Sequence, residues 1–228
     1  LVSAQNIEFK ATDIEFFQNQ NLTVANNGIV LIKEDKISAE GNEIKYFKDK
    51  SLLKVKEGKI FKTDENIEIS AQNIEYRIDK SNLNLKKDVQ INDKNNNLFI
   101  NSNEINYDII NKLITSRTDT EIVDNLGNIY KVKEFEYSLK KKIIKLSQLI
   151  AFDANKNSFI VDIAYIDLTK KELIAKDVNL NFKISENSEN EPRLKGRSFI
   201  NDENNTIVEK GTFTFCKKRE KCPPWELS

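Results

Sequence analysis

A triplet made of an apolar, a polar and an aromatic residue returns through the chain at a nearly constant interval. Fixed self-similarity with a period of roughly 20 to 50 residues is typical of repeat architectures, in which neighbouring units stack on one another. An apolar residue eight or nine positions after the start of a triplet keeps the same interval from Leu53 to Leu173. We therefore predict six stacked units. The triplets start 30, 30, 31, 30 and 30 residues apart and are Ile14-Glu15-Phe16, Ile44-Lys45-Tyr46, Ile74-Glu75-Tyr76, Ile105-Asn106-Tyr107, Phe135-Glu136-Tyr137 and Tyr165-Ile166-Asp167.

Within a unit, apolar and polar residues alternate, as in Ile67-Glu68-Ile69-Ser70-Ala71. Alternation with a period of two predicts half-buried β-strands. The apolar residues then change parity, because Ile74 and Tyr76 follow at even positions. Each parity change marks a bulge, a corner or a turn, and we predict about three short strands in each unit. The stretch 139–149 comes closest to a helical pattern, but its place in the repeat favours a strand.

The composition excludes several classes of protein. Lys and Arg number 36, as do Asp and Glu, and this balance argues against a protein held to nucleic acid by phosphate contacts. The chain has no His, which removes His-dependent triads and His-ligated zinc. Carboxylate pairs such as Asp64 and Glu65 lie among lysines and are interpreted as solvated turns. We expect no enzymatic activity, no metal site, no cofactor and no nucleic acid partner.

The inward apolar column has two interpretations. A stack of β-strands needs apolar residues for a dry structural core, and the same residues can line a slot for lipid. Alternation alone does not distinguish a filled core from a slot that stays open. A 30-residue unit cannot bury its own apolar face, so units must stack, and the last strands of the stack carry unpaired backbone groups. Such ends need caps or accept partner strands.

The end of the chain differs from the repeats. The regular pattern thins after Phe182, and Pro223 and Pro224 cannot donate to a strand ladder. We divide the chain into a β domain, 1–215, and a linker, 216–228. The two cysteines, Cys216 and Cys222, suggest an oxidising compartment and a disulfide, formed either with each other or with cysteines elsewhere; unbonded thiols in a cytosolic tail are the alternative.

The repeats and the C-terminal segment together resemble a known family. Units such as Ile69-Ser70-Ala71-Gln72-Asn73-Ile74-Glu75-Tyr76, followed by Cys216 and by Cys222-Pro223-Pro224-Trp225, are similar to the periplasmic OstA-type region of the LptD family of outer-membrane lipopolysaccharide-assembly proteins. The resemblance covers essentially the whole chain. Its C-terminal part is the more specific signal, since related bridge and inner-membrane components share the repeats.

The resemblance implies an all-β fold, an open antiparallel two-sheet β-jellyroll or β-taco. It also implies that the module binds lipopolysaccharide acyl chains between its sheets and passes them to an outer-membrane barrel, at the periplasmic face of the outer membrane. The implied partners are a periplasmic bridge protein of the LptA type, joined by strand addition, and an outer-membrane lipoprotein of the LptE type bound to the barrel. The residues predicted to face the lipid are Phe16, Ile44, Tyr46, Ile69, Ile74, Tyr76, Ile105, Tyr107 and Tyr137.

The same resemblance gives roles to the C-terminal residues. Cys216 and Cys222 match cysteines that form disulfides to the barrel, and Pro223, Pro224 and Trp225 match the linker at the membrane junction. The sequence starts at Leu1 without an initiating Met, and we expect it to be part of a longer protein whose barrel lies downstream.

Two rival functions follow from the same pattern. One is a purely structural β-solenoid with a dry core, such as an adhesin or surface stalk, whose stability lipid would not change. The other is an enzyme built on a β-helix, such as a polysaccharide lyase, which would need charged residues clustered on one exposed sheet face.

We predict that mass mapping of the intact parent protein without reduction will find Cys216 or Cys222 bridged to a cysteine of the downstream barrel. The reason is the family resemblance of the C-terminal segment. Two unbonded thiols in protein isolated under oxidising conditions would contradict the assignment.

Overall fold

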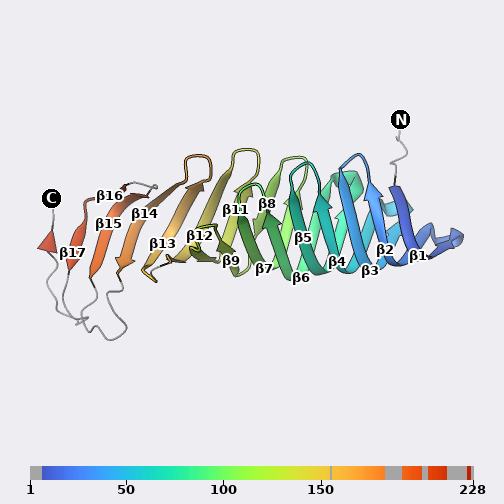
Figure 1. Cartoon of the computed structure of the whole chain (residues 1–228), viewed down its shortest axis with the longest axis horizontal. Coiled ribbons are helices and arrows are strands. Elements are labelled where there is room, and N and C mark those ends of the chain that lie inside the picture. Colours follow the sequence, from blue (N-terminus) through green and yellow to red (C-terminus); the bar gives the residue numbers. More distant parts are fainter. Residues whose placement is uncertain (1–6, 155, 183–191, 202–204, 215–224, 227–228) are drawn as a thin grey trace. The chain divides into compact units, whose positions relative to one another are not determined.

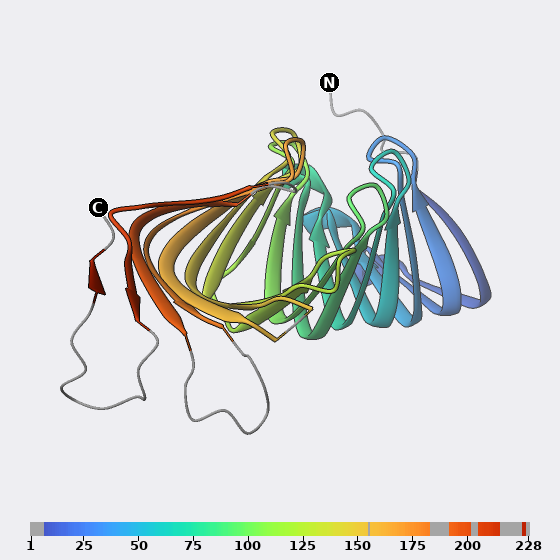
Figure 2. The same cartoon turned by 60° about the vertical axis from the view of Figure 1, so that its left-hand side comes forward.

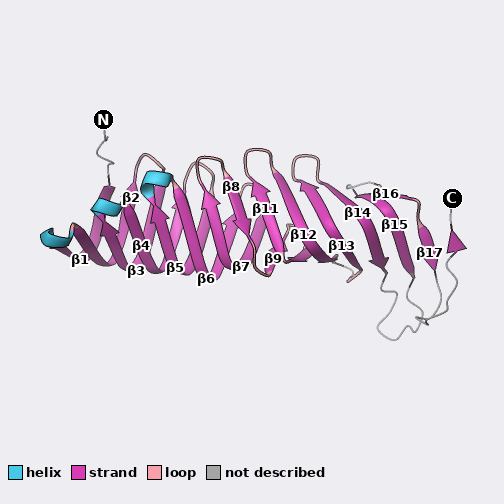
Figure 3. Cartoon of the chain, turned by 180° about the vertical axis from the view of Figure 1, so that it is seen from behind, coloured by secondary structure: helices cyan, strands magenta, loops and turns pink. Residues whose placement is uncertain are grey.

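The computed structural model describes residues 7–154, 156–182, 192–201, 205–214 and 225–226. These residues form 18 strands and three short 3-10 helices (Figure 1 and Figure 3). Strand pairing is antiparallel from β1–β2 through β17–β18. The predicted all-β antiparallel jellyroll is therefore confirmed, and the stretch 139–149 contributes to a strand rather than to a helix.

The chain divides into two compact units, residues 1–118 and residues 119–228. The elements of the first unit are β1 (Ile7–Phe17), η1 (Gln18–Gln20), β2 (Leu22–Ile32), β3 (Ile37–Phe47), η2 (Lys48–Lys50), β4 (Leu52–Lys62), β5 (Ile67–Arg77), η3 (Ile78–Lys80), β6 (Asn82–Asp93), β7 (Leu98–Asp108) and β8 (Leu113–Ser116). The elements of the second unit are β9 (Thr120–Val123), β10 (Ile129–Val132), β11 (Glu134–Ser138), β12 (Ile143–Phe152), β13 (Ser158–Asp167), β14 (Glu172–Asn181), β15 (Arg193–Asn201), β16 (Thr206–Glu209), β17 (Thr212–Thr214) and β18 (Trp225–Glu226).

Each repeat of the first unit contains two long strands, so the prediction of three short strands was wrong. The strands β1 to β5 are 11 residues long and follow one another as a meander. The parity change between Ala71 and Ile74 falls inside β5, where pairing with β6 shifts in register. A parity change inside one strand and a turn between two strands look alike in sequence, and here the change is a corner within a strand.

Left-handed backbone conformations mark these corners. Asn27 in β2 has φ 47°, Glu57 in β4 has φ 46°, and Lys87 and Asp88 in β6 have φ 65° and 50°. The same conformation recurs in the second unit at positions 148 and 177. A single left-handed residue turns the strand and flips the faces of its side chains. The left-handed residues of the first unit lie in β2, β4 and β6, and each long strand of the unit has two arms, one on either side of the corner, as the curved strands in Figure 2 show.

Small residues occupy the inner side of the corner. Ala11, Gly28, Gly41, Gly58 and Ala71 are paired in succession across β1 to β5. A Cβ atom on Gly58 would lie 2.4 Å from Val55 Cγ1 and 2.6 Å from the Glu40 carbonyl oxygen. At Gly58 the bend thus leaves no room for a Cβ atom.

The turns of the first unit form two edges, which we call lips. The first lip consists of the turns 18–21, 48–51, 78–81 and 109–112, and the second lip of the turns 33–36, 63–66 and 94–97. Backbone bonds run along each lip, such as Ile78 N–H to the Ser51 carbonyl at 2.8 Å and Thr63 N–H to the Lys36 carbonyl at 3.1 Å. Successive turns are therefore fixed to one another along each lip.

The second unit extends through β18, where the backbone of Trp225–Glu226 pairs with β17. These two residues fall in the predicted linker, which we expected to leave the sheet. The boundary at residue 215, and with it Cys216, Cys222, Pro223 and Pro224, lies outside the described residues, as does the side chain of Trp225.

We predict that Gly58→Ala lowers the free energy of unfolding by about 1 to 3 kcal/mol, because its Cβ would overlap Val55 and the Glu40 carbonyl. Gly211→Ala is the matched control, since its nearest neighbour would be Leu194 Cδ1 at an ordinary 3.4 Å. Urea unfolding of both variants measures the difference. Equal stabilities would show that the corner does not depend on glycine.

Candidate functional site

The side chains of the predicted lipid site line the inside of the bent strands. Strand register places Tyr46, Leu53, Tyr76, Leu83 and Tyr107 in one continuous row. A second row runs through Ile44, Val55, Ile74, Leu85 and Ile105. Both rows lie on the arms next to the first lip, and a third, with Ile69, lies on the opposite arms.

Most of these side chains are buried. Ile44, Ile69, Ile74 and Ile105 are 0% to 1% exposed, and Tyr76, Tyr107 and Tyr137 are 0% exposed. Tyr46 is half-buried and its ring lies 6.2 Å from that of Phe9, between ring centroids. The interior of the first unit is thus filled by its own side chains, and contact of these residues with lipid stays a prediction.

Phe16 is the exception among the predicted residues. It pairs with Thr23 and so belongs to the same inward row as Tyr46, but it is 71% exposed. The reason is that β1 is an edge strand, since it pairs with β2 and with no other described strand (Figure 1). The inward face of the first unit is therefore uncovered at β1.

Tyrosine hydroxyl groups join the two lips of the first unit. Tyr76, next to the first lip, donates a hydrogen bond to Asp35 in the second lip. Tyr107, on β7, donates in the same way to Glu65. A straight strand of 11 residues would separate the two lips by about 35 Å. The contacts form only because the corners fold the arms toward each other, and they span the mouth between the lips.

Glu65 receives a second contact from the first lip. Its Oε1 lies 3.1 Å from Lys112 Nζ, and the Glu65 side chain is 8% exposed. The interpretation of Glu65 as part of a solvated turn was therefore wrong. Burial, followed by the hydrogen bond to Glu65 and its negative charge, raises the pKa of Tyr107 well above its ordinary value. Burial and Asp35 raise the pKa of Tyr76 in the same way.

The second unit contains a cavity between its arms, with a volume of about 210 Å³. Leu173 and Leu180, near opposite ends of β14, both line it, so the strand curves around it. The rings of Phe159 and Phe199 lie 5.8 Å apart between centroids and form part of its wall. The rest of the lining is Asn128, Tyr130, Phe152, Asp153, Asn157, Ser158, Phe182, Leu194, Asn201 and Thr206.

Within the second unit, an inward row leads from Tyr137 to Leu173 in the cavity lining. Tyr137 pairs with Ile144, Ile144 with Ile166, and Ile166 with Leu173. On this row β13 therefore carries Ile166, which has no hydroxyl group to reach across the arms. This register also explains why Tyr165-Ile166-Asp167 is a weak copy of the triplet, since Tyr165 points outward and is 43% exposed.

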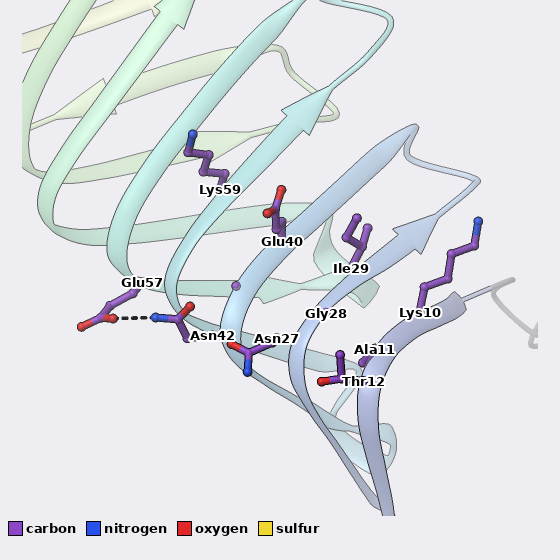
Figure 4. A pocket seen from close by; sticks show the side chains of 11 residues that line it. Lys10, Ala11, Thr12, Asn27, Gly28, Ile29, Glu40, Asn42, Glu57 and Lys59 are labelled. Atoms are coloured by element: carbon purple, nitrogen blue, oxygen red, sulfur yellow. Dashed lines mark hydrogen bonds between the residues drawn. The ribbon is translucent and has the colours of Figure 1, made fainter.

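Another cavity, of about 530 Å³, lies on the outer face of the first unit beside the corner (Figure 4). Lys10, Glu40 and Lys59 line it together with Asn42, whose amide donates to Glu57 at 2.8 Å. Its charged, exposed lining has the character of a solvated groove rather than a site for an apolar ligand. In the ranges that the structure describes, no cluster of His, Cys, Asp and Glu could hold a metal ion, and no helix could span a membrane.

Sequence reasoning missed Asp35, Glu65 and Lys112 at the mouth, and Phe159, Leu180 and Phe199 in the cavity. The signal for the first group was present, because Tyr76 follows Asp35 by 41 residues and Tyr107 follows Glu65 by 42. No pattern in the sequence distinguished the cavity residues from other inward apolar residues.

Eleven chains among the solved structures match this protein. No family model matches the chain, and no curated protein matches it. One of the matching structures is LptH, the LptA-homologous periplasmic component of the lipopolysaccharide transport device from Pseudomonas aeruginosa. The identity is 15% and the TM-score is 0.27, over 63% of this chain and 82% of that chain.

We predict that the tyrosines of the mouth make the protein less stable at alkaline pH. Their pKa values are raised in the folded state, so above pH 10 the unfolded chain loses protons that the folded chain keeps. Stability should therefore be complete below pH 10 and fall at higher pH, by up to about 1.4 kcal/mol per pH unit for each tyrosine. Urea unfolding at pH 9 and pH 11 should show a smaller loss for Tyr76→Phe/Tyr107→Phe than for the wild type. An equal loss would contradict the assignment.

Proposed function

We propose that the protein is a periplasmic module that binds the acyl chains of lipopolysaccharide between the arms of its strands. The observation that carries the proposal is the cavity of the second unit, which has an apolar wall and a polar rim. Its volume of about 210 Å³ exceeds the roughly 150 Å³ of an apolar cavity that accepts benzene. Burial of a hydrocarbon chain in this cavity would stabilise the complex by about 0.8 kcal/mol for each methylene group.

The polar rim suits a lipid with a large headgroup. Among the lining residues, Leu180 and Phe199 are buried, whereas Asn128, Asp153 and Asn157 are half-buried and Asn201 is exposed. Such a division lets an acyl chain enter and leaves a sugar headgroup in water. We propose that the module acts by binding and transfer without catalysis, and that it passes lipid to an outer-membrane barrel of the LptD type.

The edge of β1 that is not paired with β2 is available to a partner strand. Its backbone groups and the exposed Phe16 offer a template for an incoming strand. We propose that a bridge protein of the LptA type adds a strand there and continues the apolar interior. Within the same proposal the protein works at the periplasmic face of the outer membrane, with a lipoprotein of the LptE type bound to the barrel and disulfides from Cys216 and Cys222.

A purely structural β-solenoid is the second candidate. The interior of the first unit favours it, because Ile44, Ile69, Tyr76 and Tyr107 are buried against their own neighbours. In that case lipid would affect neither unit, and the cavity of the second unit would have no ligand.

We predict that Leu194→Trp lowers the affinity for a fluorescent fatty acid by about tenfold, a difference of about 1.4 kcal/mol. Leu194 is half-buried in the cavity wall, so an indole there would occupy the space of the acyl chain. Binding is measured by fluorescence titration, and purified lipopolysaccharide serves as the competitor.

The control is Leu126→Trp, the same substitution at a side chain that is 66% exposed in a loop of the same unit. It should leave the affinity unchanged, and both variants should melt within about 3 °C of the wild type. Wild-type protein that binds neither the fatty acid nor lipopolysaccharide would favour the structural candidate. Equal affinities of the two variants for the fatty acid would show that it binds outside the cavity.

A further inference from the structure

The mouth of the first unit is closed by a repeated contact. Tyr76 bonds to Asp35, and one repeat later Tyr107 bonds to Glu65. Each contact joins a tyrosine beside the first lip to a carboxylate in the second lip. The recurrence shows that closure belongs to the repeat and does not come from one chance pair.

The chemistry of these contacts suits closure that can be reversed. Tyr76 and Tyr107 place their rings in the apolar row and only their hydroxyl groups at the mouth. The rings stay in the core whether or not the hydroxyl groups are bonded. Lys112 adds an ion pair to Glu65 from a side chain that is 45% exposed. Hydrogen bonds to charged groups contribute about 1.5 to 3 kcal/mol each, a fraction of the roughly 5 to 15 kcal/mol that stabilises a folded domain, so the mouth can open without global unfolding.

The corners allow the lips to part without unfolding. The strands pair along their length on both arms, and each lip is held by its own backbone bonds. The contacts of Tyr76 and Tyr107 are hydrogen bonds from side chains and lie across the arms. Breaking them leaves the strand ladder intact.

We propose that Tyr76–Asp35 and Tyr107–Glu65–Lys112 form a latch, and that an acyl chain enters the first unit only when the latch opens. The inference rests on the proposed function, because it assumes that the interior receives acyl chains. The inference also distinguishes the two units. The second unit already contains a cavity, whereas the latch of the first unit must open before an acyl chain can enter.

The test compares wild-type protein with the variant Tyr76→Phe/Tyr107→Phe, which loses both hydroxyl groups and keeps both rings. The matched control is Tyr165→Phe. It removes a hydroxyl group from a side chain that points outward, is 43% exposed and lies outside the cavity lining. The probe is a fatty acid that carries a photoreactive group, and mass mapping assigns each adduct to residues 7–118 or to the second unit.

We expect adducts within residues 7–118 to form about threefold faster in the double variant than in the wild type or the control. Adducts in the second unit should form at the same rate in all three proteins. Hydrogen exchange without lipid should also quicken in the turns 33–36 and 63–66 of the double variant only.

The outcomes separate the latch from the proposed function. Adducts in neither unit would overturn lipid binding itself. Adducts in the second unit, with unchanged labelling and unchanged exchange in the first, would overturn the latch alone. If the double variant fails to fold, Lys112→Ala removes only an exposed partner, and it should give a smaller increase in the same two measurements; no increase would again overturn the latch.

Discussion

The corner within the long strands is the constraint on which the rest of the structure depends. Non-glycine residues such as Asn27 and Glu57 adopt left-handed backbone conformations there, at a cost of about 1 kcal/mol or more each. In return each strand presents the apolar side chains of both arms to a common interior. Gly41 and Gly58 remove the side chains that would obstruct the bend. Without the corner the sheet would be flat, and its apolar face would remain in water.

The corner also decides which distant residues meet. Asp35 lies in the second lip and Tyr76 beside the first lip, and only folded arms bring the hydroxyl group to the carboxylate. At Tyr76 and Tyr107 the aromatic position of the triplet therefore has two roles, since the ring fills the core and the hydroxyl group closes the mouth. In the second unit, β13 provides Ile166, which has no hydroxyl group and pairs with Leu173 of the cavity lining.

The sequence predicted the period, the alternation and the inward side of residues such as Ile69 and Ile74, because these depend only on local geometry. It did not predict the number of strands, since a bend inside β5 and a turn between strands change parity in the same way. It assigned Glu65 to solvent because the residue stands in a turn. Its burial follows from contacts with Tyr107 and Lys112, which are more than 40 residues away and depend on the fold.

The choice between tyrosine and phenylalanine at the triplet can be explained in the same terms. Phenylalanine would fill the apolar row as well as tyrosine does, and it would not require a partner for a hydroxyl group in a buried position. Phe16 occupies this position at the uncovered edge of β1, where its ring is exposed. Tyr76 and Tyr107 occupy it where a carboxylate of the second lip stands opposite. A dry core alone would accept phenylalanine as well as tyrosine at these positions. The hydroxyl groups therefore indicate that holding the lips together is a separate requirement of the fold.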